Sequence, residues 1–277
     1  MSGAALRVAG SVGALAALGH AGGCASSPPP PPPPVVDEVP LQAAIDGARE
    51  AIRVLDLESL RIAAQQLALA ETAGEDEDLA RDYWRGAALF NAVLAPRAED
   101  DDRLASDNAL ATEALEATLA RRPDDVESHA MLAVVIGRRI QASPLSGITL
   151  GSSFNRHRKA SADARSTNAR VAYLEGAGLL KRASDAEDLE ATVEVLLQAE
   201  RLFEAESDRV RATDSLDWAS DWGRPLNLMF LGEAHERLGE TDQASVWFGR
   251  AIEASPALQR AQEGYRRCTK GTESGSP

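Results

Sequence analysis

The side chains that could carry chemistry are few, and they lie far apart in the sequence. After His20, the histidines are His129, His157 and His235, and no two of them have the four-residue spacing that places two zinc ligands on one helix face. Cys268 follows two arginines near the end of the chain, where we expect an inert surface thiol rather than a nucleophile. The sequence therefore predicts no enzymatic activity, no metal site and no cofactor.

A basic segment offers one possible anion site. The Gly- and Ser-rich stretch 143–153 is predicted to be a loop, and it leads into a helix that carries Arg156, His157, Arg158 and Lys159. The N-terminus of a helix, together with basic side chains, can hold an anion. A basic face exposed to water explains the same residues without a ligand, and the sequence leaves both interpretations open.

Two of the four tryptophans, Trp218 and Trp222, lie in one predicted interhelical loop. Tryptophan buries a large area at a small cost in rotamers, so it is an efficient anchor for a binding partner. The alternative is that both rings close the hydrophobic seam between helical repeats.

The composition and net charge exclude further classes of protein. The chain has 277 residues, with 29 Lys and Arg against 43 Asp and Glu, which gives a formal net charge of −14. This excess of acid argues against a general nucleic-acid binder, which needs clustered cations. Two cysteines cannot form a disulfide framework, and abundant Ala, Leu, Glu and Arg favour helices.

The N-terminal segment is predicted to be a signal. Arg7 precedes a weakly apolar run at residues 8–23, which is shorter than a membrane span but typical of a secretory signal. The run ends in Gly22-Gly23-Cys24, which resembles the bacterial lipobox. The resemblance implies that residues 1–23 are removed, that Cys24 carries lipid such as palmitate, and that the protein faces the periplasm from a membrane. Two alternatives are ordinary cleavage that leaves a free Cys24 and an unprocessed disordered tail.

Residues 24–40 are predicted to be a linker. The seven prolines from Pro28 to Pro34 favour an extended polyproline II conformation, which would act as a semi-rigid spacer between membrane and folded domain.

The remaining chain is predicted to be helical from residue 41 to residue 267, with a disordered tail at 268–277. Apolar residues recur at helical spacing throughout, and no alternating stretch indicates a strand. Two periodic segments at 41–55 and 60–70 come first, followed by predicted helices at 79–94, 104–120, 126–141, 155–165, 168–182, 187–206, 225–238, 242–254 and 257–267.

One helical pair near the C-terminus carries a recognisable pattern. Small residues are spaced where two helices approach closely, large apolar residues fill the gap, and Gly239 is placed to take a left-handed conformation in the turn. The pattern resembles the tetratricopeptide repeat, and its signature positions are Leu228, Leu231, Gly232, His235, Ala244, Phe248, Ala251 and Pro256.

Weaker copies of the repeat occur earlier, with Gly176 and Ala133 at the small position and Leu196 on a later second helix. A segment at 137–147 and the Trp222-Gly223 pair are similar to those of bacterial repeat proteins that have no established reaction. The resemblance implies an all-α fold, a right-handed stack of antiparallel helix pairs called an α-solenoid.

Such a stack would bind partners along its concave face. We therefore expect a non-enzymatic adaptor or scaffold of the cell envelope that binds a protein or peptide. An acidic segment or carboxyl terminus would suit the two adjacent arginines on the fifth predicted helix. One alternative is a periplasmic lipoprotein component of a solute transport system, which needs an enclosed pocket, and another is an enzyme of unrecognised class. The candidate binding residues are Arg138, Arg139, Tyr173, Trp218, Trp222, Asn227 and Glu233.

Overall fold

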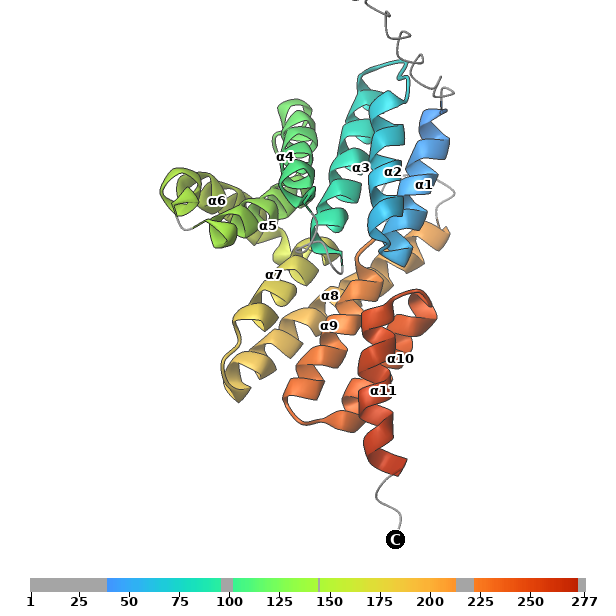
Figure 1. Ribbon diagram of the computed structural model, residues 1–277, viewed down its shortest axis with the longest axis vertical. Coiled ribbons are helices and arrows are strands. Elements are labelled where there is room, and N and C mark those ends of the chain that lie inside the picture. Colours follow the sequence, from blue (N-terminus) through green and yellow to red (C-terminus); the bar gives the residue numbers. More distant parts are fainter. Residues whose placement is uncertain (1–38, 96–101, 144, 213–221, 274–277) are drawn as a thin grey trace, which may run out of the picture. The chain divides into compact units, whose positions relative to one another are not determined.

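The described part of the chain is helical. The computed structural model describes residues 39–95, 102–143, 145–212 and 222–273, and within these ranges it contains eleven α-helices and one short 3₁₀ turn, with no strand (Figure 1). The predicted signal and most of the linker, with Cys24, lie outside these ranges, as does Trp218. The helices are α1 Leu41–Val54, α2 Leu57–Leu69, α3 Glu75–Leu94, α4 Leu104–Arg121, α5 Val126–Ala142, α6 Ser146–Ala162, α7 Ala169–Arg182, α8 Ala186–Ala212, α9 Arg224–Arg237, α10 Thr241–Ala254 and α11 Gln259–Glu273, and the 3₁₀ turn η2 is Asp163–Ser166.

Helices that follow one another in sequence pack as pairs. The most extensive packing joins α3 to α4, α5 to α6, α7 to α8 and α9 to α10 (Figure 1). Helix α2 packs on α1 and more extensively on α3, and α11 packs against α10 and α9. The all-α prediction is therefore confirmed, and sequential pairing is consistent with a stack of helical repeats. No helix among the described residues combines the length and the apolar character needed to cross a membrane.

Close approach within the pairs depends on glycine. A Cβ atom added to Gly232 of α9 would lie 2.7 Å from Cδ1 of Phe248 on α10, and one added to Gly86 of α3 would lie 2.6 Å from Cδ2 of Leu115 on α4. Gly176 of α7 meets the side chain of Leu196 on α8 in the same way. Because a methyl group would not fit at any of these points, the glycines set how closely the paired helices pack.

Helices α9 and α10 pack through the residues that the spacing predicts. Ala244, Phe248 and Ala251 are fully buried, and Leu231 is buried in the facing helix α9. Gly239, in the turn between α9 and α10, has φ of +81°, the left-handed conformation that the sequence predicts for it.

Some boundaries predicted from the sequence were wrong. The Gly- and Ser-rich stretch was predicted to be a loop, but α6 begins at Ser146, because packing against α5 outweighs the low helix propensity of its glycines. For example, the ring of Phe154 on α6 lies 3.3 Å from the position that a Cβ atom on Gly137 of α5 would occupy. Helix α11 continues to Glu273, into the predicted tail, and its Cys268 is buried rather than on the surface.

A buried polar network joins helices from both halves of the domain. Arg170 of α7 is only 2% exposed and lies between Glu127 of α5, at 3.4 Å, and Glu206 of α8, at 3.1 Å. Burial acts to lower the pKa of Arg170, but these two carboxylates and Tyr83 outweigh it and leave the pKa raised. The Tyr83 hydroxyl donates to Glu127 and accepts a hydrogen bond of 3.0 Å from Nε1 of Trp222. This network fixes Trp222 against α3.

Candidate functional site

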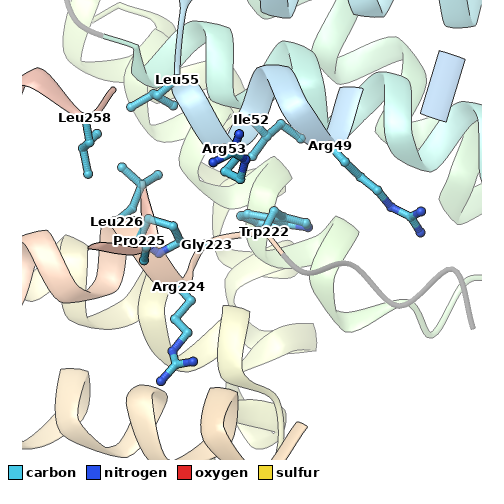
Figure 2. Close-up of a pocket in the computed structure, with 11 residues that line it drawn as sticks. Arg49, Ile52, Arg53, Leu55, Trp222, Gly223, Arg224, Pro225, Leu226 and Leu258 are labelled. Carbon is cyan, nitrogen blue, oxygen red and sulfur yellow. The ribbon is translucent and has the colours of Figure 1, made fainter. Parts of the chain in front are cut away.

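A small pocket lies where three separate parts of the fold meet. The C-terminal end of α1 forms one wall, the residues that begin α9 form another, and the turn between α10 and α11 closes the third side (Figure 2). We call it the seam pocket, and its volume is about 210 Å³. Its lining residues are Arg49, Ile52, Arg53, Leu55, Trp222, Gly223, Arg224, Pro225, Leu226, Ala254 and Leu258.

A direct contact holds the first and last parts of the domain together at this pocket. The Ser255 hydroxyl, at the end of α10, donates a hydrogen bond to the backbone carbonyl of Arg53 in α1, 202 residues away in the sequence. Ser255 is fully buried, so the bond is shielded from water. The pocket is therefore a product of the tertiary fold.

Leu55 lies on the pocket wall in an unusual conformation. It is the C-cap of α1 and has φ of 54° and ψ of 38°, in the left-handed region, where its backbone N–H donates to the carbonyl of Ala51. This conformation costs a residue with a side chain about 1–2 kcal/mol, and residues held in it often cluster at functional sites. Here the strained backbone places a nearly buried leucine side chain at the pocket.

Trp222 and Gly223 shape the opposite wall. The Trp222 ring is 3% exposed and packs 5.8 Å from the ring of Phe90, centroid to centroid. Gly223 has φ of +97°, and a Cβ on it would lie 3.3 Å from the ring of Phe203. The turn that starts α9 thus needs glycine for both its conformation and its space, and Pro225 follows in the first turn of the helix, where its ring is compatible with helix geometry.

Charge in the pocket comes from three arginines, and no acidic residue lines it. The guanidinium groups of Arg49 and Arg224 point away from Leu226 and Leu258, so neither cation faces the apolar interior (Figure 2). The guanidinium of Arg49 lies over the ring of Trp84, 4.9 Å from its centroid. Each arginine already has an acidic partner outside the lining: Arg49 pairs with Asp46 at 3.1 Å, Arg53 with Glu50 at 2.6 Å, and Arg224 with Glu200 at 2.7 Å.

The pairs shift the pKa values of their members. The hydrogen bond from Arg53 lowers the pKa of Glu50, and the hydrogen bond to Glu200 raises the pKa of Arg224. Both shifts keep the groups ionised near neutral pH. Because all three arginines are paired and two of them point away, a carboxylate that enters the pocket would gain little from their charge, and its apolar contacts must supply most of the binding energy.

The size of the pocket limits what it can hold. Pockets for small molecules and cofactors usually measure about 300–1,000 Å³, which is larger than this one. One side chain or the end of a polypeptide suits the volume better than a whole metabolite.

The residues that the sequence suggested for a binding groove do not lie together on an open face. Tyr173, Trp222 and Asn227 are buried, because each lies on a side of its element that packs against a neighbouring helix. Asn227, for example, donates through Nδ2 to the carbonyl of Leu196, 3.1 Å away. Trp222 packs in the hydrophobic core, as the alternative interpretation expected for it, whereas Trp218 lies outside the described residues.

The other candidate residues are nearer the surface. Glu233 is half-buried and pairs with Arg260 at 2.5 Å, and burial raises its pKa despite this partner. Arg139 is exposed near the end of α5, and its neighbour Arg138 is half-buried. His235, from the repeat signature, is half-buried, bonds Glu240 Oε2 at 2.6 Å and stacks on Trp247.

Sequence reasoning missed a pair of histidines that the fold brings together. Nδ1 of His129 on α5 lies 2.8 Å from Nδ1 of His157 on α6. Nε2 of His129 is 2.9 Å from the carbonyl of Pro123, which can only accept, so neutral His129 carries its proton on Nε2. Its Nδ1 then accepts from His157. Burial, with the charges of His129 and Arg156, lowers the pKa of His157 to about 4.

The described residues contain no group of three or more His, Cys, Asp or Glu side chains arranged to hold a metal ion. The two histidines therefore form a pair without a third such ligand in this part of the chain.

No model of a known protein family matches the chain, and no curated protein is similar enough in sequence to be matched with it. The architecture of sequential helix pairs is thus established from the structure alone.

Proposed function

We propose that the chain is a non-enzymatic scaffold of the tetratricopeptide type, a right-handed stack of helix pairs that binds a partner protein or peptide. The repeat pattern of α9 and α10, with Gly232 packed against Phe248, supports this assignment. With the lipobox-like Cys24, the proposal places the protein on a membrane of the cell envelope, facing the periplasm.

The observation that carries the binding proposal is the seam pocket. Its interior is formed by Ile52, Leu55, Leu226 and Leu258, and its lining includes three arginines and no acid. This combination suits an apolar side chain next to a carboxylate, as occurs at the carboxyl terminus of a polypeptide that ends in an aliphatic residue. The small volume favours this ligand over the metabolite that a solute transport component would hold.

The test is a binding assay with defined peptides. Labelled peptides that vary in their last three residues, each with a free or an amidated carboxyl terminus, would be titrated with the full chain in fluorescence anisotropy. We expect preference for an aliphatic last residue and a free carboxylate.

Two variants connect that preference to the pocket. Arg53→Glu reverses the charge at the rim, and Ala254→Leu fills part of the interior; each should weaken binding at least tenfold. Arg201→Glu, on the exposed side of α8, makes the same charge change elsewhere and should bind like the wild type. Circular dichroism must first show equal helicity. The proposal would be refuted if peptides with free and amidated carboxyl termini bound equally well, or if all variants bound equally well.

A further inference from the structure

The hairpin formed by α5 and α6 has an outer side that little else covers. Helix α6 packs mainly on α5 and on the short η2 turn, and only His157 and Ser161 among its seventeen residues are buried. Figure 1 shows α6 on the outer side of α5, away from α1 to α3 and from α9 to α11. Most of the α6 surface is therefore available to a partner.

The turn of this hairpin exposes two aliphatic side chains. Leu145 is 78% exposed and Ile148 is 83% exposed, more than Val246 at 55% or Ile62 at 54% elsewhere in the described chain. They lie three residues apart at the start of α6, so they form a small apolar tip. Isolated exposed hydrophobic residues are common, and the tip becomes informative only with the charges around it.

Those charges are all positive. Residues 128–162 contain no Asp or Glu and five cations, in a chain whose formal net charge is −14. Two of the cations lie on the last turns of α5 and three on the second half of α6. They are Arg138, Arg139, Arg156, Arg158 and Lys159.

Three of the exposed cations have no acidic partner among the residues that the structure describes. Arg139, Arg158 and Lys159 are exposed and form no ion pair with any residue that the structure describes. Many arginines in the rest of the described domain do pair with acids: Arg61 pairs with Asp107 of another helix at 2.5 Å, and Arg250 pairs with Glu200 at 3.0 Å. The hairpin therefore carries unpaired positive charge, although the chain as a whole has more acidic than basic residues.

We infer that the α5–α6 hairpin docks onto the surface of a membrane that contains anionic phospholipid. The apolar tip enters the interface, and the cations lie near the headgroups. Ile148 and Lys159 are separated by about 16 Å along the helix, which keeps both within reach of one surface. A cluster of cations next to exposed aliphatic side chains suits attraction to an anionic membrane surface, with shallow insertion of the apolar tip.

The arrangement suits a membrane better than an acidic protein. The cations are spread over two helices and none of them lines the seam pocket, so a continuous anionic surface can contact many of them without matching individual positions. This inference is independent of the peptide-binding proposal, since none of these residues lines the seam pocket.

The test is co-sedimentation of the full chain with lipid vesicles. The chain carries Cys24→Ser throughout, so that no acyl group contributes. Vesicles of phosphatidylcholine alone are compared with vesicles that contain about one third phosphatidylglycerol. We expect binding to the anionic vesicles only, and weaker binding as salt is raised.

Two hairpin variants and a matched control locate the surface. Arg139→Glu/Arg158→Glu/Lys159→Glu should reduce the affinity for anionic vesicles by well over tenfold, because each cation near such a surface contributes a factor of about five. Leu145→Ser/Ile148→Ser should also reduce it, with the net charge unchanged. The control variant Arg201→Glu/Arg266→Glu/Lys270→Glu makes the same charge change at exposed positions of α8 and α11. Its affinity for anionic vesicles should fall much less.

The outcomes are distinct. Selective loss in the two hairpin variants, with helicity unchanged, supports the inference. Absence of wild-type binding to anionic vesicles overturns it, and binding to polyglutamate in the same buffer would then assign the basic face to an acidic polypeptide. Equal losses in the hairpin and control triple variants would also overturn it, because they would show that only net charge matters.

Discussion

Replacing Gly232 with alanine tests the helix pairing with a single methyl group. Alanine is the better helix former, so at an open position in a helix this change stabilises a protein by about 0.5–1 kcal/mol. At Gly232 the new Cβ would lie 2.7–2.8 Å from three ring atoms of Phe248, which is fully buried and also packs against Gly264. The ring therefore has little freedom to move away.

The magnitude follows from these opposing effects. Forcing an extra methyl group into a packed core costs about 1–3 kcal/mol, which exceeds the gain in helix propensity. We expect Gly232→Ala to lower the free energy of unfolding by about 1–2 kcal/mol. In a domain of this size the midpoint of thermal unfolding should fall by about 2–8 °C.

Gly249→Ala is the matched control, in the facing helix of the same pair. Its Cβ would lie 3.7 Å from the ring of Tyr265, an ordinary contact, so this variant should be more stable than the wild type by about 0.5–1 kcal/mol. Urea denaturation followed by circular dichroism measures both changes. If the two substitutions shift the free energy of unfolding in the same direction by similar amounts, the conclusion that α9 and α10 pack closely at Gly232 is wrong.

Three other predictions concern the buried network, the histidine pair and the anchor. Arg170→Ala should cost about 3–5 kcal/mol in urea denaturation, because it leaves Glu127 and Glu206 without their buried partner, whereas Arg201→Ala on the surface should change stability by less than about 0.5 kcal/mol. Because the pKa of His157 is about 4 in the folded protein and about 6.5 when unfolded, the unfolded chain binds more protons between these values. Stability should therefore fall as the pH is lowered from 6.5 to 4, and His157→Leu should make that dependence shallower; an identical pH profile would contradict the assignment. Metabolic labelling with a fatty-acid analogue should mark the wild type and not Cys24→Ser, and equal labelling of both would end the lipoprotein proposal.

The features that the sequence predicted well depend on local spacing. The intervals between Gly232, Ala244, Phe248 and Ala251 are fixed by helix geometry and by one short turn, so they indicate which residues meet inside the pair. The left-handed turn at Gly239 is equally local. All of these follow from residues within one helical pair.

The features that the sequence did not predict depend on how different pairs pack. The bond between Trp222 and Tyr83 joins residues 139 positions apart, and the contact between Ser255 and Arg53 spans 202. Nothing in the local pattern specifies such contacts, so the seam pocket could not be anticipated. Tyr173 was expected to line a groove, yet it is 1% exposed, because a helix in a stack packs on several sides and its periodicity does not show which side stays open.

The contact between Ser255 and Arg53 also changes how the domain should come apart. In a linear stack each repeat touches only its neighbours, so a terminal repeat can fray while the remainder stays folded. Here the turn after α10 rests on α1, and separating the two would expose Leu55 and Leu258 to water. The two ends therefore stabilise each other, and we expect them to unfold together. This coupling makes unfolding more cooperative than in an open array, and because the contact spans most of the chain, folding should be slower than for repeats that add one at a time.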